Sequence, residues 1–308
     1  MEDDPWHPEK DLKEDAFLER TDLPLGISLW RKIVNRLMFI LIIVAVLLAV
    51  VPLILILGDV AIKGAPAINI DFLTHLPTGP TFSGGGIASA VAGSFTMVGL
   101  AALISVPIGV GAGIFFSEWS SSKLSTISGF MNDVLTGFPS MVIGLFVYII
   151  IVLNTKHYSA FAGAVALSFI MLPIVARTTD ESLKLVPNTL REASMALGVP
   201  RWKTIFRIVI STGKTGLLTG VVLAIARATG ETAPLLFTAA TSTYYITNLF
   251  TQPTGSMTVL IYNYATSPYA TWVTQAWGAA LVLILIMLGL NLFVKIVIGR
   301  NLTEARME

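Results

Sequence analysis

The sequence predicts an all-α, polytopic membrane protein with six transmembrane helices. Of its 308 residues, 54% are hydrophobic and only 13% are charged, and the mean hydropathy is +0.77. Such a composition excludes an ordinary soluble domain. Several uncharged runs are long enough to cross the hydrocarbon core of a bilayer, which is about 30 Å thick. The Lys and Arg residues fall almost entirely between alternate runs, as in a multi-pass protein.

Residues 1–30 are expected to form an acidic cytoplasmic tail. They are rich in Asp and Glu, and their only basic residues are Lys10, Lys13 and Arg20. A secretory signal needs a basic start followed directly by an apolar run, so this segment does not have the pattern of a signal peptide. The first apolar run is therefore expected to remain in the protein as a span. At the other end, residues 301–308 are expected to form a cytoplasmic C-terminal tail.

Six spans are predicted within residues 31–300, five of them from uncharged runs. These five runs are Leu37 to Gly58, Ile87 to Ser117, Val134 to Leu153, Tyr158 to Ala176 and Trp272 to Val294. A weaker segment, Ile205 to Thr229, is interrupted by Lys214 and Arg227. Omitting this segment would reverse the last span and place the basic C-terminal end outside. Six spans therefore fit the charge pattern better than five.

The positive charges orient the predicted spans with both termini in the cytoplasm. In that orientation the outer segments contain only Lys63 and Lys156, and Arg227 lies inside a span. All other Lys and Arg residues fall on the inner side, as the positive-inside rule requires. In the second span, Gly109 and Gly113 are spaced for close helix packing, either within the subunit or between subunits.

Residues 178–204 form a charged segment between two spans, on the predicted cytoplasmic side. Pro187 ends one helix and allows another to begin, and a glycine after the second helix can close it. Leu190, Ala193 and Leu197 recur at helical spacing, so we expect a short amphipathic helix. Its apolar face either lies on the membrane or on its own bundle, or it docks onto a partner protein.

The order of residues in this helix resembles the EAA loop of the membrane permeases of ABC importers. Glu192, Ala193 and Gly198 stand at motif positions of that family, while Ser194 replaces its second Ala. The resemblance implies a coupling helix that docks onto an ATPase, with Arg191, Glu192, Ala193 and Gly198 as the coupling residues. A helix held between two spans can transmit the closure of the ATPase as rigid-body motion.

The chain itself shows no nucleotide, metal or catalytic site. Thr212-Gly213-Lys214-Thr215 looks like the end of a phosphate-binding loop, but Ile208 stands where that loop needs Gly, and no strand precedes it. The three histidines, His7, His75 and His157, have no ligand-like spacing, and there is no cysteine. We therefore expect no bound cofactor, and we expect ATP to be used by a separate chain. An intramembrane enzyme would need a buried nucleophile and base, which the spans lack.

A charge pair, Arg227 and Glu231, falls deep in the weaker span. Arg227 lies about 20 Å along a helix from Lys214. A charge at that depth costs at least about 2.5 kcal/mol, so we expect Arg227 to face a water-accessible interior. Glu231 is one turn further and can pair with it. The pair either stabilises the helix end alone, or Arg227 lines the path of an anionic substrate while Glu231 holds or gates it.

Four further stretches carry a resemblance over most of the chain. They are Ser83–Ile87, Gly137–Tyr148, Leu172–Thr179 and Ala226–Pro234. Together they resemble the PstA family, one of the two permease families of bacterial and archaeal phosphate ABC importers. The resemblance implies the type I ABC importer permease fold, a prokaryotic plasma or inner membrane, and one half of a phosphate translocation path.

The same resemblance implies the partners of the chain. They are a PstC-like second permease, a PstB-like ATPase dimer, a PstS-like extracytoplasmic phosphate-binding protein and membrane lipid, with no nucleic acid. The sister permease family PstC and a permease for another oxyanion remain alternatives. An ion-coupled secondary transporter or channel is an alternative of a different class. It would need intramembrane acidic relays or inverted repeats, whereas Glu231 is the only carboxylate near a span centre.

Overall fold

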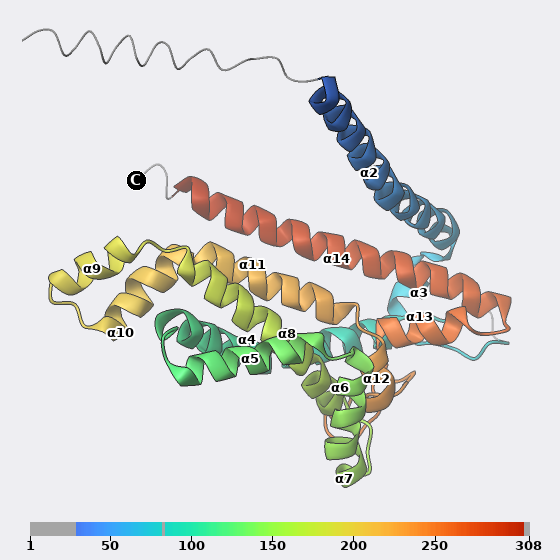
Figure 1. Cartoon of the computed structure of the whole chain (residues 1–308). Coiled ribbons are helices and arrows are strands. Elements are labelled where there is room, and N and C mark those ends of the chain that lie inside the picture. The colour runs from blue at the N-terminus through green and yellow to red at the C-terminus, as the bar shows by residue number, and fades with distance from the viewer. Residues whose placement is uncertain (1–28, 82–83, 305–308) are drawn as a thin grey trace, which may run out of the picture. The chain divides into compact units, whose positions relative to one another are not determined.

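The computed structural model describes residues 29–81 and 84–304 (Figure 1). All regular elements among these residues are helices. The predicted acidic tail falls outside them up to residue 28, and residues 305–308 of the predicted C-terminal tail also lie outside. The chain divides into two compact units, Met1–Gly58 and Asp59–Glu308.

The first unit contains most of helix α2, which runs over Leu29–Gly64 and has Pro52 inside it. Its apolar side chains are exposed from Leu37 to Leu57. Trp30–Ala67 is long and apolar enough to cross a membrane. This helix is the predicted first span, and its apolar surface suits a lipid environment.

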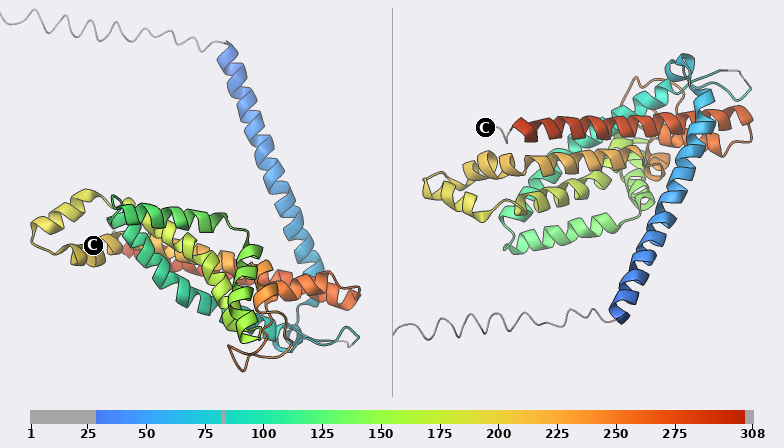
Figure 2. Two further views of the ribbon diagram at one scale, coloured as in Figure 1. Left: turned by 60° about the horizontal axis from the view of Figure 1, so that its bottom comes forward. Right: turned by 90° about the horizontal axis from the view of Figure 1, so that it is seen from above.

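The second unit is built around three long helices that lie side by side (Figures 1 and 2). They are α4 (Ala88–Glu118), α8 (Ala160–Lys184) and α11 (Ile210–Thr229). Their buried core includes Met97, Leu167, Met171, Val175 and Ala224. These helices correspond to the second, fourth and fifth predicted spans.

The two spaced glycines of α4 face α8 within the same chain. A Cβ atom added at Gly113 would lie 2.5 Å from the carbonyl oxygen of Ala176 and 2.5 Å from Cβ of Thr179. One added at Gly109 would lie 2.8 Å from Cβ of Val175. The predicted close packing is therefore confirmed, and it occurs between helices of one subunit.

The third predicted span, Val134 to Leu153, contains a sharp bend that the sequence analysis did not predict. Helix α5 (Lys123–Gly137) ends before Phe138, and α6 begins at Ser140, with an angle of 103° between the two segments. Pro139 explains the break, because it has no backbone N–H and disfavours the helical conformation of the residue before it. Within residues 29–81 and 84–304, five single helices are long and apolar enough to cross a membrane, and the bent pair makes six if it is counted as one span.

The remaining elements of this unit pack around the three long helices, and some of them form a second, smaller core. Helix α6 (Ser140–Val147) continues through a π-turn at Tyr148–Val152 into α7 (Leu153–Thr155). Helix α12 (Ala233–Thr238) packs along α6. The short elements η2 (Ala65–Ala67), α3 (Ile70–Thr74) and α13 (Met257–Ala265) pack near the long α14 (Ala270–Glu304). Phe72, Ile87 and Met257 are buried between α3, α4, α13 and α14. Because α14 extends past Val294, residues 301–304 of the predicted tail are helical.

Candidate functional site: the coupling hairpin and the Arg227–Glu231 pair

The segment between α8 and α11 folds into a helical hairpin. Helix α8 continues to Lys184, so the predicted segment 178–204 begins inside it. Helix α9 (Asn188–Ala196) follows Pro187, and α10 (Arg201–Thr204) follows Pro200. A π-turn at Ile205–Val209 then leads into α11. We call α9 and α10, with the turn between them, the coupling hairpin.

Gly198 closes α9 as the sequence predicts. Its φ is +77°, a left-handed conformation that residues with a Cβ atom adopt only at a cost. The N–H of Gly198 donates to the carbonyl oxygen of Met195, and that of Val199 donates to the carbonyl oxygen of Ser194. The glycine thereby reverses the chain and satisfies carbonyl groups at the end of the helix.

The apolar side of α9 is exposed. Leu197 is 84% exposed, and Leu190 and Met195 are also exposed. Glu192 and Ala193 lie on the surface of the same helix. The predicted amphipathic helix therefore exists, and its apolar residues, Leu197 above all, leave apolar surface exposed.

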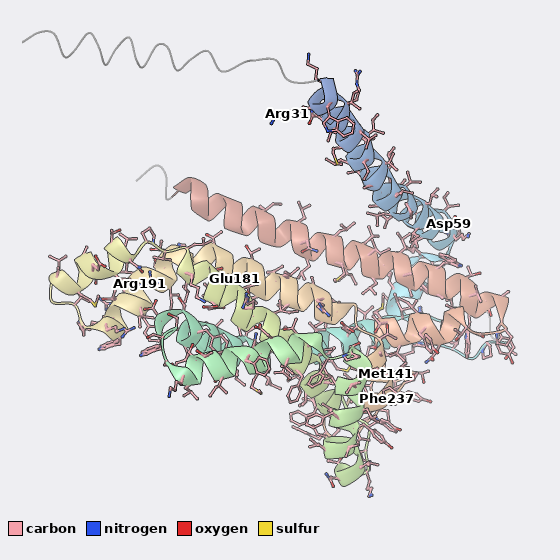
Figure 3. All side chains as sticks on the ribbon, in the orientation of Figure 1. Arg31, Asp59, Met141, Glu181, Arg191 and Phe237 are labelled. Carbon is pink, nitrogen blue, oxygen red and sulfur yellow. The ribbon has the colours of Figure 1, made fainter. Side chains whose placement is uncertain are left out.

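Another part of the α9 surface, next to Leu190 and Leu197, faces the protein. Arg191, labelled in Figure 3, is the one predicted coupling residue whose side chain is mostly covered. It pairs with Glu118 at the end of α4. Ser194 is buried, and its hydroxyl oxygen lies 2.8 Å from that of Thr204. The helix thus separates exposed residues, Glu192 and Leu197 among them, from residues that hold the hairpin in place.

Arg227 and Glu231 come together at the end of α11. Nε of Arg227 lies 3.7 Å from Oε1 of Glu231, close enough for an ion pair but too long for a hydrogen bond. The Arg227 side chain is 56% exposed, whereas that of Glu231 is mostly covered. Among the described residues, Arg227 forms this ion pair and donates no hydrogen bond. Its guanidinium therefore keeps its donors free.

The backbone around Glu231 is a break between two helices. Helix α11 ends at Thr229, and α12 begins at Ala233 with Pro234 in its first turn. The hydroxyl of Thr258, on α13, donates to the backbone carbonyl oxygen of Glu231 at 2.9 Å. This bond satisfies a polar group that the break exposes. Irregular backbone at membrane depth is tolerated where it is covered by protein or lines a cavity.

A small hollow lies between Arg227 and the bend that separates α5 from α6. It is also lined by Thr136, Phe138, Ser140 and Pro173. Helix α6 packs along α12, and Met141 and Phe237 mark these two neighbouring helices in Figure 3. The bend that the sequence analysis missed is therefore part of the surroundings of Arg227.

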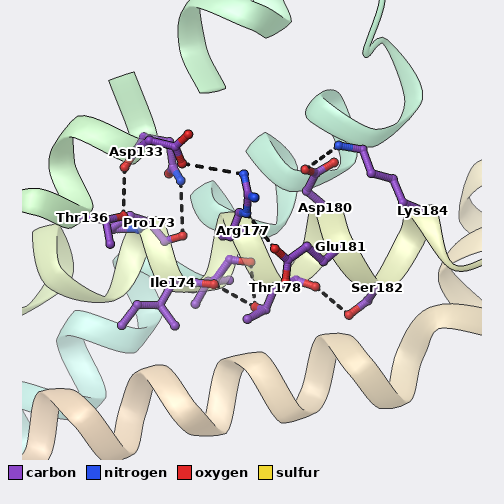
Figure 4. A network of polar contacts seen from close by, with 12 residues as sticks. Asp133, Thr136, Pro173, Ile174, Arg177, Thr178, Asp180, Glu181, Ser182 and Lys184 are labelled. Carbon is purple, nitrogen blue, oxygen red and sulfur yellow. Dashed lines mark hydrogen bonds and ion pairs between the residues drawn. The ribbon is translucent and has the colours of Figure 1, made fainter. Parts of the chain in front are cut away.

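A polar network lies on the face of α8 that meets α5 (Figure 4). Arg177 donates to Glu181 at 2.8 Å and lies 3.7 Å from Asp133, and Lys184 donates to Asp180 at 2.8 Å. The sequence analysis did not select this network or Glu118. The pairs Arg177–Glu181 and Asp180–Lys184 are each four residues apart in α8, so the sequence could have predicted them. No local signal predicts contacts between separate helices.

The phosphate-loop lookalike Thr212–Thr215 lies inside helix α11. A nucleotide-binding loop must wrap its backbone N–H groups around the phosphates, and a continuous helix cannot do so. The structure therefore agrees with the sequence in placing no phosphate-binding loop at Gly213.

Comparisons with known proteins assign the fold. Residues 105–301 match the family described as binding-protein-dependent transport system inner membrane component. A chain of the inward-facing MetNI methionine ABC transporter aligns with a TM-score of 0.57 and 16% identity, covering 70% of this chain and 94% of that one. At that identity the likeness shows a shared ABC importer permease fold.

Curated relatives share much more of the sequence. A phosphate transport system permease protein PstA of Yersinia pestis is 40% identical over 292 residues, covering 94% of this chain and 98% of its own length. The PstA protein of Haemophilus influenzae is 44% identical over 268 residues, covering 87% and 94%. One from Xylella fastidiosa is 46% identical over 241 residues, covering 78% and 83%. The chain therefore belongs to the binding-protein-dependent transport system inner membrane component family, as a multi-pass permease of its PstA branch with no ATPase site of its own.

Proposed function

We propose that this chain forms one half of the phosphate path of an ATP-driven importer, with Arg227 and Glu231 on that path. The free guanidinium of Arg227 is the observation that carries the proposal. A planar guanidinium with unused N–H groups suits the oxygens of a phosphate ion. Glu231 stays within ion-pair distance and partly neutralises Arg227 when no anion is bound. The PstA relatives support phosphate as the substrate.

The exposed side of α9 is proposed to dock onto the ATPase. Glu192, Ala193 and Leu197 would contact it, and Gly198 would shape the turn that presents them. A charged residue beside exposed apolar ones is suited to a specific protein contact. The partners would be a second permease like PstC, an ATPase dimer like PstB that uses the ATP, and an extracytoplasmic binding protein like PstS. This chain would bind no cofactor.

The proposed orientation puts both termini and the coupling hairpin in the cytoplasm, in the plasma or inner membrane of a prokaryote. It follows from the distribution of Lys and Arg. Because the chain has no cysteine, the labelling of a single introduced cysteine can show on which side of the membrane that position lies. A membrane-impermeant maleimide applied to intact cells should label Lys156→Cys and spare Thr189→Cys. The reverse pattern would contradict the orientation.

ATP-dependent phosphate uptake tests the path. The chain would be reconstituted in vesicles with its candidate permease, ATPase and binding protein. Arg227→Ala should abolish uptake while the complex still assembles. Lys214→Ala is the matched control, because it removes an exposed positive charge from the same helix and should leave uptake unchanged. Normal uptake by Arg227→Ala would show that the Arg227–Glu231 pair only stabilises the structure and is not part of the phosphate path.

Docking is tested separately by Glu192→Lys. This variant should insert normally but lose the ATPase on co-purification. Retention of the ATPase and normal uptake would exclude Glu192 from the contact. Thr189→Lys places the same charge on another exposed position of α9 and serves as the control.

A further inference from the structure

One guanidinium, that of Arg191, joins three helices. Its Nε and Nη2 atoms donate to Oε1 of Glu118 at 3.1 and 3.0 Å. Nη2 also donates to the carbonyl oxygen of Leu183 at 2.9 Å, and Nη1 donates to that of Val186 at 2.6 Å. Nη1 further reaches Oδ1 of Asn188 at 3.2 Å. The start of α9 is thereby tied to the ends of α4 and α8.

This contact is shielded from solvent. The side chains of Arg191 and Glu118 are 15% and 5% exposed. A buried, charge-assisted contact in which two N–H groups of Arg191 converge on one carboxylate oxygen is stronger and geometrically more specific than an exposed ion pair. Lys could keep the charge of Arg191, but its single ammonium could not span Glu118 and both carbonyl groups at once. We call this contact the Arg191–Glu118 clamp.

The end of α4 also holds the second helix of the coupling hairpin. Arg201 donates to the backbone carbonyl oxygen of Glu118, and its guanidinium carbon lies 5.0 Å from the centre of the Trp119 ring. The buried contact between Ser194 and Thr204 joins α9 to α10. The hairpin is therefore closed on itself and fastened to α4 at both of its helices.

Helices α4 and α8, which Arg191 contacts, extend from the coupling hairpin to the surroundings of Arg227. Gly113 lets α4 approach Ala176 and Thr179 of α8 so closely that the two helices are packed backbone to backbone. Pro173, further along α8, lines the hollow beside Arg227. A displacement applied to α9 can thus reach the surroundings of Arg227 through tightly packed elements.

We propose that the Arg191–Glu118 clamp transmits the motion of the coupling hairpin to α4 and α8, and so couples ATP use to opening of the path. Arg191 is then a positioning residue that acts through Glu118, and it is not itself an ATPase contact. This inference rests on the proposed docking of the exposed side of α9. It adds the contact between α9 and the membrane helices to the proposed contact between α9 and the ATPase.

The first test compares Arg191→Lys with wild type in vesicles containing the full transporter. The ATPase should co-purify as in wild type, and the binding protein should still stimulate ATP hydrolysis. Phosphate imported per ATP should fall by about tenfold, within the range of couplings between distant protein sites. Glu118→Gln should give the same uncoupled behaviour.

Arg177→Lys is the matched control for this test. Arg177 also pairs with carboxylates, those of Glu181 on the same helix and Asp133 on α5, but all three side chains are exposed (Figure 4). The same chemical change there should leave phosphate imported per ATP unchanged. An unchanged ratio for Arg191→Lys would overturn the proposal. Loss of the ATPase from Arg191→Lys would overturn it too, because Arg191 would then act in docking.

The second test measures whether α4 and α9 move together, as the distance between two spin labels. Spin labels at Ser121→Cys, just beyond α4, and Thr189→Cys, on α9, fall on exposed residues of a chain with no native cysteine. In an otherwise wild-type complex, the distance between the labels should stay the same with and without ATP. With Arg191→Lys added, the distance distribution should broaden or shift with nucleotide.

The two tests separate this inference from the proposed function. A label distance that changes with ATP in the otherwise wild-type complex would show that the clamp is not a rigid link. A wild-type complex that hydrolyses ATP without importing phosphate would overturn the proposed function. In that case a constant label distance, lost in Arg191→Lys, would still support the mechanical link.

Discussion

The hydroxyl oxygens of Ser194 and Thr204 lie 2.8 Å apart in a buried contact between α9 and α10. Ser194 occupies the position at which the EAA motif has its second Ala, so this chain builds a polar contact there. A buried hydroxyl needs a partner, and each of these two supplies it to the other.

Replacing Ser194 by Ala should loosen the coupling hairpin. The Thr204 hydroxyl would remain buried without this partner, at a cost of about 1–3 kcal/mol. Hydrogen exchange of the α9 amides should therefore be faster than in wild type. The double variant Ser194→Ala/Thr204→Val should recover much of the loss, because it removes both polar groups. Equal exchange in the single variant and wild type would contradict this account.

Gly113→Ala should destabilise the pairing of α4 with α8. The new methyl group would meet the Ala176 carbonyl oxygen and the Thr179 side chain, and overpacking of this kind costs about 1–3 kcal/mol. A lower midpoint of thermal unfolding in detergent is the expected result. Gly111→Ala is the control on the same helix, since a Cβ atom there meets nothing within 4 Å. A similar midpoint for both variants would refute the packing role.

Gly198→Ala should strain the turn between α9 and α10. An L-residue with a Cβ atom pays about 1–2 kcal/mol for the left-handed conformation that Gly198 adopts. Asn tolerates this conformation better, so Gly198→Asn should be milder. We expect reduced co-purification of the ATPase with Gly198→Ala and a smaller reduction with Gly198→Asn. The opposite order would show that backbone conformation is not the reason for the glycine.

Thr258→Val should weaken the helix break at Glu231. The substitution keeps the shape of the side chain but removes the hydroxyl that donates to the Glu231 carbonyl oxygen, at a cost of about 1–3 kcal/mol. Phosphate uptake should fall while the amount of assembled complex stays the same. Thr266→Val is the control, because that hydroxyl bonds only within the end of α13. An equal effect of both substitutions would exclude a specific role for Thr258.

Local patterns predicted most helices correctly. Uncharged runs located α2, α4, α8 and α14, and the charge pattern retained the weaker segment that became α11. Pro187 and Gly198 marked the ends of α9. The bend at Pro139 was missed because a hydropathy run measures length and apolarity, and both continue through the break. The Phe138-Pro139 pair was the signal that could have revealed it.

The sequence predicted the contact between residues that are close in the chain, but not the contact between residues that are far apart in it. Arg227 and Glu231 are one helical turn apart, so their pairing was visible in the sequence. Arg191 and Glu118 are separated by 73 residues, and nothing local indicates which acidic residue Arg191 meets. Its position in the motif suggested an ATPase contact, whereas its side chain turns inward to Glu118.

The sequence by itself determined where the chain is apolar enough to span a membrane, where α9 begins and ends, and which two charges pair near the end of α11. These properties depend on composition and on neighbours within a turn or two. Only the tertiary structure decided the 103° bend, the packing of Gly113 against α8, and the partner of Arg191. These depend on which helix surfaces meet, because burial and hydrogen-bond satisfaction are set jointly by residues far apart in the chain.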